Sequence, residues 1–259
     1  MIRLLIAVFA LAWTPVFAGS PPSTVDLLRS LHLDPGFRQD LRKRGYTGER
    51  FEIMVDHTRR LYSDAEIVGG LERRIAGILE RNGYKVSNGL LVSVDTMMTQ
   101  AYTSGLSRLT AAERAQLFSV DAGFYRAIPM RDCNRMLNGR LSGERTQKLL
   151  DAYLVQLPPR SLAAYYAATR QAMRLGLSGR SRSEVLSASE IRAVEEAIFP
   201  VVDQIIGAQK HADKLYDAWS GGPAKAGRYA CSFNQIFSAA ALNLKGPTRD
   251  RAILYMMTQ

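Results

Sequence analysis

Apolar residues recur every three to four positions along most of this 259-residue chain, and no segment sustains the period-two alternation of a half-buried strand. Between Ser63 and Asn82, for example, Ile67, Leu71 and Ile75 form a stripe that would cover one side of a helix. The periodicity therefore predicts an all-α fold, with about eight to ten helices in a single globular domain over residues 19–259.

Capping residues predict where two of these helices begin. Thr110 followed by Glu113 has the spacing of a capping box, in which each side chain bonds the other residue's backbone N–H. Pro129 should end that helix. Farther along, Ser189 is expected to cap a long helix whose apolar stripe reaches Leu215, with Pro200 producing a kink inside it.

The stretch 177–187 is the best candidate for a linker. It holds serine, glycine and arginine with few apolar side chains, which is the composition of an exposed loop. Two lobes meeting at 177–187 are an alternative to the single domain.

The first eighteen residues have the pattern of a secretory signal peptide. Arg3 supplies a positive start, residues 4–13 form an uncharged apolar run, and Val16 and Ala18 are small residues at the positions that a signal peptidase recognises. We expect cleavage after Ala18 and a periplasmic or secreted protein. Charged residues interrupt all the remaining apolar stretches, so the mature chain is expected to be soluble.

Cys133 and Cys231 are the only cysteines. In an oxidising compartment they are expected to form one disulfide, which would close a loop of nearly a hundred residues. Because the bond would cross residues 177–187, it favours a shared core. A catalytic cysteine is disfavoured, since no histidine lies near either residue in sequence.

Common catalytic motifs are missing from the sequence. There is no G-x-S-x-G, no H-E-x-x-H and no complete phosphate-binding loop, and the glycine-rich stretch 221–227 is followed by Arg228 rather than by Lys and Ser or Thr. With three histidines and two cysteines, we expect no metal site and no cofactor.

The densest polar group consists of Glu52, Asp56, His57 and Arg60. Glu52 and Asp56 are four residues apart and would share a helix face that Arg60 continues. The favoured interpretation is an ion-paired surface. The alternative is a helical envelope enzyme that acts on polysaccharide or lipid, with Glu52, Asp56 and His57 as acid and base residues.

The strongest lead to function is charge. Lys and Arg number 34 against 24 Asp and Glu, so the formal net charge is +10. Basic residues cluster at Arg38, Arg42, Lys43, Arg44 and Arg50, and again at Arg180 and Arg182. An exported protein rarely meets nucleic acid, so we expect a binding protein whose partner is an acidic protein, as for an inhibitor or immunity-type protein, with no nucleic acid. An anionic membrane surface is the alternative partner, and general solubility the plainest explanation of the charge.

Overall fold

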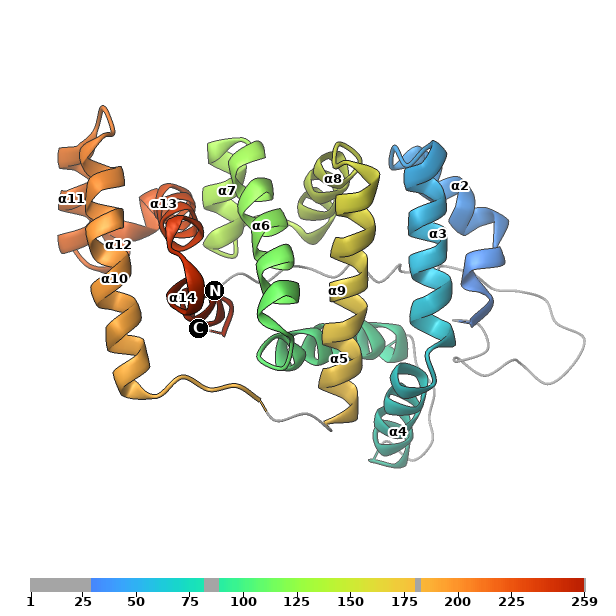
Figure 1. Cartoon of the computed structure of the whole chain (residues 1–259). Helices are drawn as coiled ribbons and strands as arrows, with labels where there is room; N and C mark the ends of the chain where they lie inside the picture. The colour runs from blue at the N-terminus through green and yellow to red at the C-terminus, as the bar shows by residue number, and fades with distance from the viewer. Residues whose placement is uncertain (1–28, 82–88, 180–182, 259) are drawn as a thin grey trace, which may run out of the picture. The chain divides into compact units, whose positions relative to one another are not determined.

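A computed structural model describes residues 29–81, 89–179 and 183–258, and within these ranges every regular element is a helix (Figure 1). The all-α prediction is confirmed, although the described residues form more helices than the eight to ten expected. None of the helices in these ranges is long and apolar enough to cross a membrane. The predicted signal peptide, residues 1–18, lies outside the described residues.

The chain divides into two compact units, each built from segments far apart in sequence. Among the described residues, unit 1 comprises 109–153 and 184–258, and unit 2 comprises 29–81, 89–108, 154–179 and 183. One boundary falls between residues 183 and 184, inside the stretch 177–187. The single-domain organisation of residues 19–259 stays a prediction.

Unit 2 is organised around one long helix, α9, which contacts α3, α4 and α5. Its elements are η1 (Leu31–Leu33), α2 (Pro35–Lys43), α3 (Gly48–Ser63), α4 (Ala65–Arg81), α5 (Gly89–Leu106) and α9 (Pro159–Ser178). Pro159 occupies the first turn of α9, where its missing N–H leaves no hydrogen bond unmade, and Gly179 ends the helix in a left-handed conformation. Leu162, Tyr165 and Tyr166 follow the three-and-four spacing of one face of α9 and are buried.

Unit 1 is organised around α13, which contacts α6, α7, α10 and α14. Its elements are α6 (Ala111–Ala127), α7 (Met130–Leu137), α8 (Gly143–Leu154, with Leu154 at the boundary), α10 (Ala188–Gly207), α11 (Ala212–Ser220), α12 (Pro223–Ala226), η2 (Gly227–Tyr229), α13 (Ala230–Asn243) and α14 (Gly246–Thr258). The predicted capping box of Thr110 and Glu113 begins α6, which is confirmed.

The predicted long helix after residue 187 differs from the prediction at both ends. Ser187 caps α10, because it places Glu190 at the third helical position, where the carboxylate completes a capping box; Ser189 would have placed Arg192 there. At the other end α10 stops at Gly207, a residue of low helix propensity, and the predicted stripe continues on the separate helix α11.

The disulfide between Cys133 and Cys231 is present, as predicted, and joins α7 to α13 across a Cα–Cα distance of 5.5 Å. Both cysteines are fully buried. The bond crosses residues 177–187 in sequence, but both segments that it joins belong to unit 1. It therefore gives no support to a core shared between the units, contrary to the expectation from sequence.

Reduction of this disulfide should destabilise unit 1 by at most about 4 to 5 kcal/mol, the loop-entropy value for a separation of 98 residues. Urea denaturation of the protein with and without reductant measures the change. A double variant, Cys133→Ala with Cys231→Ala, is the control and should not respond to reductant. The expectation would be contradicted if the unsubstituted protein had the same unfolding midpoint with and without reductant.

Candidate anion-binding site

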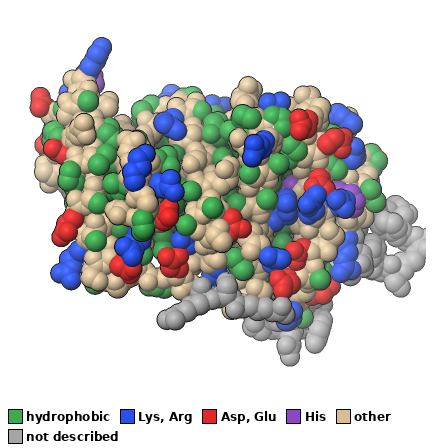
Figure 2. Space-filling view, in the orientation of Figure 1, with side chains coloured by type: hydrophobic (Ala, Val, Ile, Leu, Met, Phe, Trp, Pro, Cys, Tyr) green, Lys and Arg blue, Asp and Glu red, His purple; other side chains and the backbone are tan. Residues whose placement is uncertain are grey.

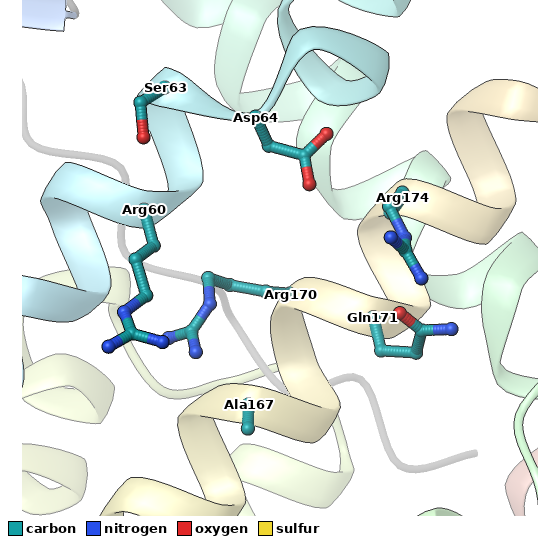
Figure 3. Close-up of a pocket in the computed structure, with 7 residues that line it drawn as sticks. All are labelled: Arg60, Ser63, Asp64, Ala167, Arg170, Gln171 and Arg174. Atoms are coloured by element: carbon teal, nitrogen blue, oxygen red, sulfur yellow. The ribbon is translucent and has the colours of Figure 1, made fainter.

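A polar depression of about 380 Å³ lies in unit 2 between the C-terminal end of α3 and the middle of α9 (Figure 3). The residues that line it recur at helical spacing on each side: Arg60, Ser63 and Asp64 from the end of α3, and Ala167, Arg170, Gln171 and Arg174 from α9. One face of each helix therefore supplies the pocket, and three of the seven side chains are arginines. Basic side chains also gather over α3 on the face shown in Figure 2.

Arg170 is positioned by a histidine on the neighbouring helix. Its Nη1 lies 2.9 Å from Nδ1 of His57, and because arginine only donates, Nδ1 is the acceptor. The imidazole is buried and stacks on the ring of Tyr166 at 4.3 Å between centroids. Burial, helped by the charge of Arg170, lowers the pKa of His57 to about 3, so the ring is neutral at physiological pH.

This arrangement leaves the positive charge of Arg170 with a neutral partner. Among the described residues, no carboxylate lies within ion-pair distance of its guanidinium. Burial and then the charge of Arg60 lower the pKa of Arg170, while Asp56 and Asp64 act against that shift. Figure 3 shows the guanidinium groups of Arg60 and Arg170 pointing toward one another.

The carboxylates around the pocket are already engaged. Asp56 is bound at 2.6 Å by both Arg59 and Arg60; burial raises its pKa, but the bonds and charges of these arginines outweigh burial and lower it. Asp64 caps α4 by accepting the backbone N–H groups of Glu66 and Ile67, at 2.9 and 3.1 Å. Glu66 faces the third arginine of the pocket, Arg174, at 3.8 Å. The pocket therefore contains ion pairs at Arg60 and Arg174, and Arg170 is its arginine without a carboxylate partner among the described residues.

The three residues of the acid–base alternative contact different partners. Glu52 is 68% exposed and faces Arg38 at 3.8 Å, Asp56 is held by its arginines, and the imidazole of His57 is buried. The bond between Asp56 and Arg60 is the ion pair that the sequence favoured. The catalytic role of Glu52, Asp56 and His57 stays a prediction.

The predicted partner-binding residues of α2 surround one aromatic ring. The guanidinium groups of Arg38 and Arg42 lie over Phe51 at 4.9 and 4.7 Å from the ring centroid. Lys43, at the end of α2, is exposed. Arg42 and Lys43 are therefore available to a partner, whereas Arg38 also faces Glu52.

The other two members of the predicted group serve the fold. Arg44 lies 3.8 Å from Asp40 one turn earlier, and Nε of Arg50 donates to the backbone carbonyl of Leu157 at 2.9 Å. The bond from Arg50 ties the start of α3 to the turn before α9. The binding role of the whole basic group stays a prediction.

Sequence reasoning missed Arg170 and Arg174. These arginines are four apart on α9, and like charges at that spacing destabilise an isolated helix, so the pair was a detectable signal. The position of Arg170 against His57, 113 residues earlier, was not readable from any local pattern.

Comparison with known families, curated proteins and solved structures found no match. Within the described residues, no group of three His, Cys, Asp or Glu side chains is arranged to hold a metal ion. Function has to follow from the chemistry of the site itself.

Proposed function

We propose that this protein is a helical binding protein that acts through a protein–protein surface on an acidic partner, as an inhibitor or immunity-type protein does. The pocket between α3 and α9 receives a carboxylate of that partner. The observation that carries this function is the half-buried Arg170, oriented by a neutral histidine and lacking a carboxylate partner among the described residues.

An arginine guanidinium is suited to this role because its planar fork matches the two oxygens of a carboxylate. A carboxylate placed between Arg60 and Arg170 would offset the repulsion between the two cations. Because the pocket is open, the incoming group keeps some contact with water, and the cost of desolvating it stays small. Positive charge around the site would also raise the rate of association with an acidic protein.

We expect the encounter to take place outside the cytoplasm, because the sequence predicts a signal peptide over residues 1–18. The exposed Arg42 and Lys43 of α2 would add positive charge for an acidic partner. No metal ion or cofactor enters this function.

Reversing the charge of Arg174 should reduce capture of the acidic partner at least tenfold, because the substitution places a negative group in the pocket. The matched control is Arg160→Glu, which makes the same change in net charge on an exposed position of α9 outside the pocket. Each immobilised variant is incubated with periplasmic extract, and captured proteins are identified and quantified by mass spectrometry. A second variant, Arg170→Gln, should also lose capture.

Three results would overturn the proposal. Equal capture by the Arg174→Glu and Arg160→Glu variants would show that only net charge matters. Salt-sensitive sedimentation with anionic vesicles, without protein capture, would favour a membrane surface. Turnover of envelope polysaccharide or lipid that is lost on changing Glu52 or Asp56 to alanine would favour the enzyme.

A further inference from the structure

Unit 1 has an apolar groove of about 560 Å³ between α10 and α11. Three exposed aromatic side chains line it: Phe199 at 44% exposure, Tyr216 at 40% and Trp219 at 39%. Figure 2 shows hydrophobic side chains at the surface over these two helices. A cluster of large apolar side chains left in water is typical of an interaction site.

Helical spacing and aromatic packing give this groove its shape before any partner binds. On α10, Phe199, Val202, Asp203 and Ile206 follow the three-and-four spacing of one helix face. The ring of Trp219 packs against α13, with its centroid 5.8 Å from that of Phe233 and 5.2 Å from that of Phe237. The ring of Phe199 packs edge-to-face with Trp219, at 6.0 Å between centroids. A rigid aromatic anchor of this kind costs little conformational entropy on binding.

The charged side chains in the groove are negative, whereas the net charge of the whole chain is positive. Asp203 and Asp217 are the charged residues that line the groove in the described part of the chain, although the net charge of the whole chain is +10. Asp217 already binds Lys225 at 3.0 Å. Asp203 accepts the hydroxyl of Tyr216 at 2.6 Å, but no lysine or arginine of the described chain lies within ion-pair distance of it.

We propose that this groove docks a basic amphipathic helix of a partner protein. Apolar side chains of that helix contact Phe199 and Trp219, and a lysine or arginine beside them binds the carboxylate of Asp203. An amphipathic helix placed in an apolar groove is a common mode of peptide recognition. This site lies in unit 1 and does not depend on the anion-binding pocket of unit 2.

Tryptophan fluorescence reports directly on the groove. The sequence has two tryptophans, Trp13 and Trp219. Trp13 lies in the predicted signal peptide, so a Trp13→Phe variant keeps Trp219 as its one tryptophan whether or not residues 1–18 are cleaved. The probes are a helical peptide of leucine and lysine, about 14 residues long, and a peptide of the same pattern with glutamate for lysine. We expect the leucine–lysine peptide to shift Trp219 emission to shorter wavelength with saturation, and the leucine–glutamate peptide to leave it unchanged. Net charge alone would produce the opposite selectivity.

Two substitutions separate the charge from the apolar contact. Asp203→Asn keeps an acceptor for Tyr216 and should weaken binding of the leucine–lysine peptide about tenfold, whereas Phe199→Ala should abolish the shift. The matched controls are Glu196→Gln, which removes a negative charge from an exposed position of α10 outside the groove, and Val185→Ala, which trims an exposed apolar side chain elsewhere in unit 1. Both controls should bind the peptide normally.

Four results would overturn the proposal. Equal shifts with both peptides would show an unselective apolar surface, and no shift of Trp219 emission with either peptide would show no docking. Asp203→Asn matching Glu196→Gln would remove the role of the carboxylate. A concentration-dependent shift without peptide, together with a dimer in sedimentation, would assign the groove to a second copy of this chain. The Arg174→Glu variant, which tests the pocket of unit 2, should give the same Trp219 measurements as the unsubstituted protein even if it loses capture of the acidic partner.

Discussion

Replacing Gly105 with alanine should destabilise unit 2 by about 3 kcal/mol or more, at the upper end of overpacking effects. Gly105 of α5 faces Ala172 of α9, and a Cβ atom at Gly105 would overlap the carbonyl oxygen of Ala172. The contact is reciprocal, since a Cβ atom at Gly176 of α9 would overlap the carbonyl oxygen of Ala101 of α5. Backbone atoms cannot move aside as a flexible side chain can, so the two helices would have to separate.

Gly69→Ala in α4 is the matched control for this variant. There a Cβ atom would lie 3.4 Å from the terminal Nη1 of Arg73, which can move. Alanine should therefore stabilise the helix by up to about 1 kcal/mol through its higher helix propensity. Urea denaturation of both variants gives the comparison. If alanine at Gly105 stabilised the protein as it does at Gly69, the close approach of α5 and α9 would be wrong.

Replacing Asp121 with asparagine should stabilise unit 1 at pH 7 by roughly 4 kcal/mol and have little effect near pH 4. Asp121 lies on α6 with 3% of its surface exposed, and its Oδ1 has no hydrogen-bond partner in the structure. Burial raises the pKa of its carboxyl group from 3.8 to about 8. The folded protein therefore keeps this carboxyl neutral at physiological pH.

The sign of the pH dependence follows from the two pKa values of Asp121. The unfolded chain releases the proton near pH 3.8 and the folded chain near pH 8, so unfolding releases a proton between these values. Stability should fall by about 1.4 kcal/mol per pH unit across this window and level off above it. The side chain of asparagine has no such proton to release, so the stability of the Asp121→Asn variant should lack this slope.

Thermal unfolding of the two proteins between pH 4 and pH 9 tests this expectation. Other titrating groups affect both proteins equally, so the difference between the two curves isolates Asp121. A difference that stays constant with pH would mean that Asp121 is ionised in the folded state. The neighbouring Tyr125, whose pKa is raised by burial and by Asp121, would contribute only at higher pH.

The helical fold and several local features can be predicted from the sequence alone, because they depend on residues within one helical turn of each other. The box of Thr110 and Glu113 needs only a spacing of three residues, and it was predicted correctly. The misplaced start at Ser189 shows the limit of such rules, since Ser187 and Ser189 both suit a cap and only Glu190 distinguishes them. The disulfide needed no geometry, because two cysteines allow one intramolecular pair.

Which residues far apart in sequence come into contact is known only from the folded chain. Arg170 is a solvent-facing arginine by any local rule, and its role follows from packing α9 against α3, which places it on the neutral His57. The same holds for Asp121, whose raised pKa comes from burial in unit 1. Helical periodicity specifies which face of a helix is buried but not which helix covers it, so sites formed between helices appear only when the units are assembled.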